Sequence, residues 1–148
     1  MVKEDFKKII SDLLKNQKLG VLATDLDGLP YTSLIAFAAT DDLHHIFFST
    51  LKDTRKFSNM SRNPRVTLLI DNRSNQRTDF YDAIAVAAQG SVEELQKSQS
   101  KFRTLYLNKH PYLEEFVNSP NCALLQLNVE KYQYVSHFQD VKILELED

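Results

Sequence analysis

Several features that define common protein classes are scarce in this chain. It contains a single cysteine, Cys122, so no internal disulfide can form. No apolar run approaches the roughly 18 residues that a membrane-spanning helix needs. The first ten residues, MVKEDFKKII, are too charged and too amphipathic for a signal peptide. These absences predict a protein kept in the reducing cytoplasm, with no membrane partner.

Glycine is also rare, and the motifs that depend on it are missing. Neither GxxxxGK[ST] nor GxGxxG occurs, so any bound nucleotide must be held without a glycine-rich phosphate loop. The histidines show no HExxH or other metal-ligand spacing, and no serine lies in a GxSxG motif. The sequence therefore predicts no metal site and leaves the catalytic residues unknown. Cys122 lies in an apolar segment and is expected in the core.

The charge balance is typical of an ordinary globular protein. Apolar residues make up 43% of the chain, charged residues make up 26%, and the net charge is −2. At 148 residues the chain fits one domain, 1–148, with enough apolar surface for its own core. The net acidity argues against nucleic acid as a partner.

Apolar periodicity divides the chain into helices and strands. Residues 6–14 show the spacing of an amphipathic helix. Strands are then predicted at 19–25, 30–40, 44–50, 65–71, 83–95, 122–136 and 138–147, with Asp27-Gly28 and Asp41-Asp42 as turns. Helices are predicted at 53–63, at 96–110 and just after Pro111, a loop is predicted at 72–79, and Gly90 is expected at a bulge or a close backbone approach. These elements predict an α+β fold in which about six or seven antiparallel strands form a barrel with flanking helices.

The segment FFSTLKDTRKFSNMSRNPRV, residues 47–66, places cations at the start of a helix. If Asp53 or Thr54 caps that helix, Arg55 and Lys56 lie in its first turn, where positive charge opposes the helix dipole. Unpaired amides, basic side chains and nearby hydroxyl groups are the donors that a phosphate dianion requires. A solvated basic loop explains the composition equally well.

A second candidate surface is the strand that contains Thr32, Ser33, Leu34 and Ile35. Its backbone groups could bond the edge of a flat aromatic ring while its side chains cover the ring face. An ordinary strand would have the same composition, so these residues alone do not decide between the two interpretations.

Four segments together carry a resemblance to a known family. LGVLATDLDGLPYTSLIAF, IFFSTLKDTRKFSNMSRNPRVTLLID, VAAQGSVEEL and YQYVSHF are similar to the pyridoxamine 5'-phosphate oxidase-like family of FMN-binding split barrels, over residues 6–146. The order of elements within residues 46–70 is the most specific part. The resemblance implies a split β-barrel homodimer with FMN at the subunit interface. It assigns the FMN phosphate to Thr50, Thr54, Arg55 and Lys56 with Ser49 nearby, the isoalloxazine ring to Thr32, Ser33, Leu34 and Ile35, and an approach to the ring or ribityl chain to Gln89.

The sequence also departs from that family. The true oxidase has an arginine on the strand that here reads PYTSLIAF, and a carboxy-terminal Arg-x-His element that holds the substrate phosphate. Neither is present, which argues against oxidation of pyridoxamine phosphate. The expected function is FMN-dependent oxidoreduction of an unidentified small molecule. The alternative is a haem- or flavin-binding carrier or sensor without turnover, since relatives also hold haem or a deazaflavin and His44, His45 and His137 leave haem open.

Overall fold

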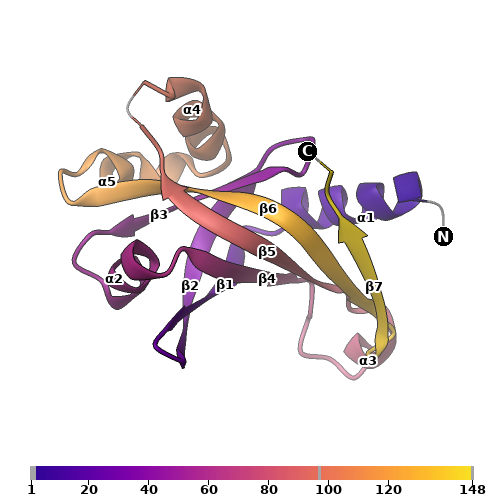
Figure 1. Cartoon of the computed structure of the whole chain (residues 1–148). Helices are drawn as coiled ribbons and strands as arrows, with labels where there is room; N and C mark the ends of the chain where they lie inside the picture. Colours follow the sequence, from indigo (N-terminus) through magenta and orange to yellow (C-terminus); the bar gives the residue numbers. More distant parts are fainter. Residues whose placement is uncertain (1–2, 97, 148) are drawn as a thin grey trace.

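The computed structural model describes residues 3–96 and 98–147. Figure 1 shows its helices and strands arranged around one barrel. In chain order they are α1 (Lys3–Asn16), β1 (Leu19–Leu26), β2 (Leu29–Ala39), β3 (His45–Leu51), α2 (Arg55–Arg62), β4 (Arg65–Asp71), α3 (Asp79–Asp82), β5 (Ala85–Glu94), α4 (Ser100–Lys109), the 3₁₀ turn η1 (Pro111–Leu113), α5 (Glu114–Asn118), β6 (Cys122–Ser136) and β7 (Asp140–Glu145).

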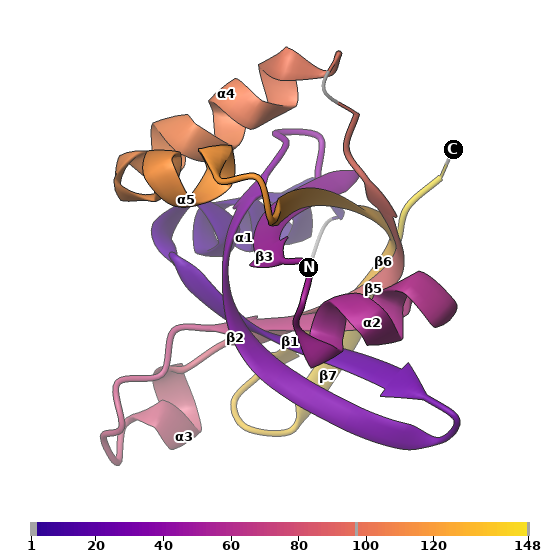
Figure 2. The same ribbon diagram turned by 90° about the vertical axis from the view of Figure 1, so that its left-hand side faces the viewer.

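All strand pairs are antiparallel, and six strands close on themselves. The strand order is β3-β2-β1-β4-β5-β6-β7, and β3 also pairs with β6. This last pairing closes the barrel, whose ring of strands is seen in Figure 2. The seventh strand, β7, extends the sheet beyond the ring by pairing with β6. The predicted α+β barrel of six or seven strands is therefore confirmed.

Strand β6 is 15 residues long and takes part in both parts of the sheet. Its first half pairs with β3 and its second half with β7, while β5 runs along its other edge. The β5–β6 register shifts between Gln89 and Gly90. A Cβ atom on Gly90 would lie 1.9 Å from the carbonyl oxygen of Asn128. Both features predicted for Gly90, a bulge and a close backbone approach, are confirmed.

The barrel interior holds the main core, and helices lie at its two ends. Helix α1 buries Phe6, Ile10, Leu13 and Leu14, which share one helical face, in this core. Helix α2 lies at the opposite end of the barrel from α1 (Figure 1). Among the described residues, no helix is long and apolar enough to cross a membrane.

A smaller core forms outside the barrel. Ala38 of β2, Phe47 of β3 and Leu124 of β6 project outward and pack with Tyr106 of α4 and Val117 of α5. Helices α4 and α5 thus cover the outer face of β2, β3 and β6. These helices form a second layer on one side of the barrel.

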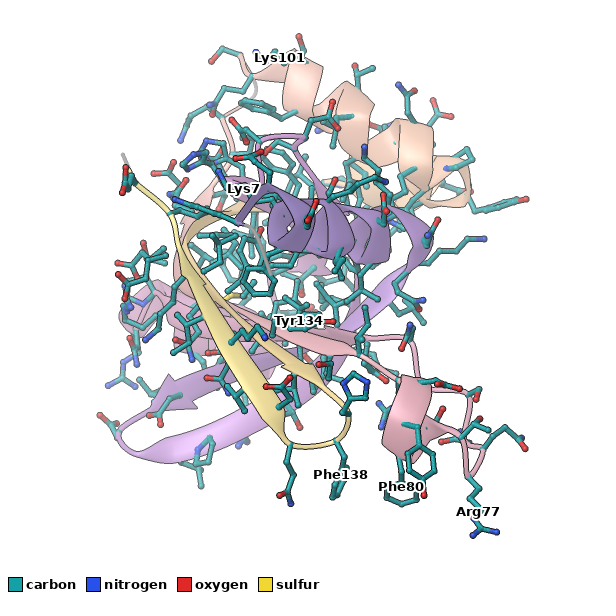
Figure 3. All side chains as sticks on the ribbon, turned by 90° about the vertical axis from the view of Figure 1, so that its right-hand side faces the viewer. Lys7, Arg77, Phe80, Lys101, Tyr134 and Phe138 are labelled. Carbon is teal, nitrogen blue, oxygen red and sulfur yellow. The ribbon has the colours of Figure 1, made fainter. Side chains whose placement is uncertain are left out.

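Helix α3 lies next to the segment predicted as a loop, and the sequence prediction missed it. The carboxylate of Asp79 accepts hydrogen bonds from the backbone amides of Ser74, Asn75 and Gln76. These bonds lower the pKa of Asp79. Polar contacts within residues 74–79 therefore determine the conformation of this segment, and such contacts produce no apolar periodicity in the sequence. Figure 3 shows Phe80 of α3 beside Phe138 of the β6–β7 turn, and their ring centroids lie 5.2 Å apart.

The close approach at Gly90 makes a testable prediction about stability. Gly90→Ala should lower the free energy of unfolding by about 1 to 3 kcal/mol, because the added methyl group forces β5 away from the Asn128 carbonyl. Urea denaturation measures this loss. The control is Gly28→Asn, at a turn position with φ of 82° and no atom within 4 Å of the added Cβ, where the loss should stay below about 1 kcal/mol. Equal losses in the two variants would contradict the account.

Candidate functional site

The site begins with the cap of helix α2. Thr54 is the N-cap, which resolves the choice between Asp53 and Thr54: its Oγ1 accepts a hydrogen bond from the Phe57 amide at 3.3 Å. The first amides of a helix have no intrahelical partner. Among the described residues, the amides of Arg55 and Lys56 have no acceptor. The start of α2 therefore presents two free backbone donors, an arrangement suited to an anion.

A cavity of about 290 Å³ lies beside this helix start. Lys56 lines it, is half-buried, and forms no ion pair with any described carboxylate. Its charge is therefore available to a ligand. The other lining residues are Leu34, Ile35 and Ala36 of β2, Ser49, Thr50 and Leu51 of β3, Thr54, Tyr106 of α4, Leu113 and Phe116. The structure thus brings together Leu34, Ile35, Ser49, Thr50, Thr54 and Lys56 from the predicted set.

The hydroxyl groups at the cavity differ in what they can still donate. The Tyr106 hydroxyl donates to the carbonyl oxygen of Ala36 at 3.0 Å, and it lies 2.8 Å from Ser49 Oγ. Because Tyr106 has one hydroxyl hydrogen, Ser49 must be the donor in their shared bond. Burial raises the pKa of Tyr106, so the phenol stays protonated. Ser49 therefore ties α4 to β3 and has no hydrogen left for a ligand.

Thr50 and Thr54 form a second hydroxyl pair, with their Oγ1 atoms 3.1 Å apart. Thr54 Oγ1 donates to the Leu51 carbonyl at 2.8 Å, and Thr50 Oγ1 makes a longer bond of 3.2 Å to the same oxygen. The longer contact is the weaker one. Thr50 is thus the hydroxyl that can turn toward a ligand at the lowest cost.

The four β2 residues predicted to lie along the isoalloxazine ring point alternately to the outside and the inside of the barrel. Thr32 and Leu34 project outward, and Leu34 is 67% exposed. Ile35 is 4% exposed and packs in the barrel core. Ser33, the register partner of buried Leu22, has a buried Oγ with no hydrogen-bond partner. Ser33 and Ile35 can therefore reach an outer ligand only through their backbone groups.

Arg55 and Gln89, like Thr32 and Ser33, do not line this cavity. Arg55 lines a separate hollow next to the β1–β2 hairpin, where its guanidinium carbon is 5.8 Å from the centroid of the Tyr31 ring. Consecutive helical side chains point in different directions, so Arg55 and Lys56 diverge although they are adjacent in sequence. Gln89 lies on β5 in the same outward row as Thr32, separated from it by the paired residues Ala23 and Thr67.

The aromatic wall of the cavity was not predicted as part of the site. Tyr106, Leu113 and Phe116 come from α4 and the segment after it. The sequence predicted a helix at 96–110, which includes Tyr106, but the Ser49–Tyr106 contact spans 57 residues and leaves no local signal. Cys122 also differs from expectation: it is half-buried rather than in the core, and burial raises the pKa of its thiol. No group of three potential metal ligands occurs among the described residues.

Comparisons with known proteins place this geometry in context. The family model described as "Pyridoxamine 5'-phosphate oxidase" matches residues 6–136. General stress protein 26 of Bacillus subtilis (strain 168) is 25% identical over 130 residues, which cover 88% of each chain. The structure of a heme binding protein from Mycobacterium smegmatis matches with a TM-score of 0.85 at 14% identity, covering 98% of this chain and 60% of that one. A FAD-binding protein from Mesorhizobium loti matches with a TM-score of 0.70 at 18% identity, covering 93% of both chains. At these identities the structural matches show a shared fold.

We predict that the hydrogen bonds of Tyr106 hold α4, and with it the wall of the cavity, against the barrel. Tyr106→Phe should lower the free energy of unfolding by about 1 to 3 kcal/mol, because the Ser49 hydroxyl and the Ala36 carbonyl lose a buried partner. Thermal or urea denaturation measures the loss. Tyr112→Phe is the matched control, since Tyr112 is 94% exposed, and its effect should stay within about 0.5 kcal/mol. A neutral Tyr106→Phe variant would show that these bonds do not hold α4.

Proposed function

Because this chain belongs to the pyridoxamine 5'-phosphate oxidase family, we propose that it is an FMN-binding homodimer and an oxidoreductase acting on a small molecule. The observation that carries the proposal is the start of α2, where the free amides of the first helical turn lie next to a cavity lined by Thr54 and by Lys56, whose ammonium has no carboxylate partner among the described residues. That donor set fits a phosphate monoester. The hydroxyl of Thr50 would add a further donor by turning away from its long bond to the Leu51 carbonyl.

A bound phosphate would explain why the sequence places basic side chains at the start of α2. Basic side chains in the first turn of a helix oppose the helix dipole by roughly 0.3 to 1 kcal/mol. A bound phosphate dianion would offset this cost, since it attracts both Lys56 and the helix start. Charge-assisted hydrogen bonds contribute roughly 1.5 to 3 kcal/mol each. Arg55, held over Tyr31, would add a longer-range positive field from the side.

The ring end would rest against the outward side of β2. Leu34 supplies exposed apolar surface there, and Thr32 supplies a hydroxyl group on the same face. FMN, when bound, supplies one- or two-electron transfer, and the protein supplies binding and orientation. This division of labour requires no acid–base pair in the chain. FAD, which appears in the name of the Mesorhizobium loti protein, has a pyrophosphate with no terminal phosphate monoester, so the donor set fits FMN better.

The proposed partner is a second copy of the chain, and the outer face of the barrel supports it. Leu34, Val21, Leu69 and Ala87 are register partners across β2, β1, β4 and β5, and they alternate with core residues, so all four project outward. None of them is fully buried, and Leu69 is 39% exposed. This row is apolar and free of charge. A second copy would cover it, bringing Gln89 of the neighbouring row close to the junction.

Haem binding without turnover is the second candidate. His44 and His45 are adjacent, with ring centroids 6.4 Å apart, and His45 Nδ1 lies 3.0 Å from Asn128 Oδ1. That contact leaves the other ring nitrogen of His45 as a possible iron ligand. The similarity in fold to a heme binding protein adds weight to this alternative. Absorbance distinguishes the two cofactors, because haem gives a Soret band and FMN a band at longer wavelength.

The phosphate site predicts a selective loss of FMN affinity. Lys56→Ala should weaken FMN binding by about 10- to 100-fold, because one charge-assisted contact is lost. Riboflavin binding should stay unchanged, since riboflavin lacks the phosphate. Quenching of flavin fluorescence measures both affinities.

The matched control is Lys52→Ala, in the same basic segment. Lys52 pairs with Glu94 at 3.8 Å and lines a different cavity, so its removal should leave FMN affinity within about twofold. An equal loss in both variants would indicate a general charge effect. No loss in Lys56→Ala would remove the assignment of the phosphate to this cavity.

The proposed dimer predicts the effect of a charge on the outer row. Leu69→Lys should shift the protein toward monomer, because burying an unpaired ammonium at an interface is unfavourable. Light scattering coupled to size-exclusion chromatography measures the mass. Tyr112→Lys, a change at a 94% exposed position on a different face, should leave the mass unaltered. A Leu69→Lys variant that stays dimeric would exclude this face as the interface.

A further inference from the structure

A second cavity lies between α1, α4 and the β2–β3 connection, away from the proposed FMN site. Its volume is about 350 Å³, at the lower end of the range for small-molecule pockets. Leu14, Leu43 and Leu105 give it apolar walls, and Asn108 and Lys109 of α4 add polar groups. None of its lining residues belongs to the cavity beside α2.

Lys109 is the unusual group in this cavity. Its side chain is half-buried, and its Nζ donates a hydrogen bond to the Leu14 carbonyl at 2.8 Å. The same atom lies 4.0 Å from the centroid of the Phe37 ring. Among the described residues, no carboxylate forms an ion pair with it. Burial lowers the pKa of Lys109 to about 8.

The contact with Leu14 explains only part of this arrangement. It caps the carboxyl end of α1 and uses one of the three donors of the ammonium group. A capping lysine does not need to be buried, because its stem can lie along the surface with the charge in water. Here the charge is partly withdrawn from water, and its neighbours are the Leu14 carbonyl and the face of the Phe37 ring. No described carboxylate balances it, so an anion in the cavity would lower the cost of its burial.

The remaining charged groups around the cavity leave a net positive charge. Asp41 is its one lining carboxylate among the described residues, and Lys15, 3.6 Å away, neutralises it. His110 follows Lys109, and its Nε2 lies 2.6 Å from the Phe37 carbonyl oxygen. Burial, opposed by that hydrogen bond and assisted by the charges of Lys109 and Lys18, lowers the pKa of His110, so this ring is neutral at neutral pH. The charge that remains is that of Lys109.

We propose that this cavity binds a small carboxylate with an apolar tail, such as a medium-chain fatty acid, with the carboxylate paired to Lys109 and the tail against the leucine walls. An inorganic anion would leave the exposed apolar surface of Ala39 and Leu105 in water, and a neutral apolar molecule would leave the ammonium without a negative charge beside it. An amphipathic anion satisfies both parts of the cavity.

Calorimetric titration of octanoate into the full-length protein at neutral pH tests the proposal. Wild-type protein should bind octanoate saturably, and Lys109→Met, which keeps the length of the side chain without its charge, should bind about tenfold more weakly or worse. The matched control is Lys15→Met at the rim, where the ammonium already has Asp41 as its partner, and its affinity should change less than about threefold. Absence of saturable binding by the wild type would overturn the proposal, as would equal binding by Lys109→Met.

A second readout needs no variant and is unaffected by any folding defect of Lys109→Met. The pKa of the Lys109 ammonium is followed by NMR with and without octanoate. Pairing with a carboxylate should raise this pKa by roughly 1 or more, because a nearby negative charge favours the protonated form. A pKa that does not move at saturating octanoate would show that Lys109 only caps α1. Neither experiment depends on FMN.

Discussion

The pairing of β3 with β6 is the constraint on which the rest of the structure depends. It closes the barrel, and it aligns Ser49 with Leu124 and Thr50 with Ala123. Strand β3 ends at Leu51, and Thr54 caps α2 only three residues later. The free amides of α2 are therefore fixed next to the hydroxyl groups at the end of β3. The same pairing brings the outward faces of β3 and β6 together, where α4 and α5 pack.

The two layers of the fold have different roles at the site. The barrel supplies rigid strand ends and the start of α2, which position the proposed phosphate contacts. The outer layer supplies the aromatic wall, which is tied to the barrel through the Ser49–Tyr106–Ala36 hydrogen bonds. Ser49 therefore contributes to the site by holding its wall, although its position beside the basic cluster suggested direct contact with a ligand. The candidate site is thus assembled from two layers, with the proposed phosphate contacts on the barrel and the aromatic side chains on the outer layer.

Local signals in the sequence were sufficient for the fold and for several residues that line the candidate cavity. Apolar periodicity located the strands, the Gly90 bulge was predicted from one residue, and the Thr54 cap was one of two alternatives. These local signals could not predict which cavity or core each side chain faces in the folded protein. Adjacent Arg55 and Lys56 line different cavities, and Ile35 belongs to the core because strand residues alternate. Helix α3 depends on the polar contacts of Asp79, which carry no periodicity.

The central claim is that the start of α2 recognises a phosphate monoester. The most direct test compares the affinities of the wild-type protein for FMN and for riboflavin, which share the ring and differ in the phosphate. Two or more charge-assisted bonds predict that FMN binds at least about a hundredfold more tightly. Equal affinities for the two flavins would contradict the claim, because they would show that the ring alone is recognised.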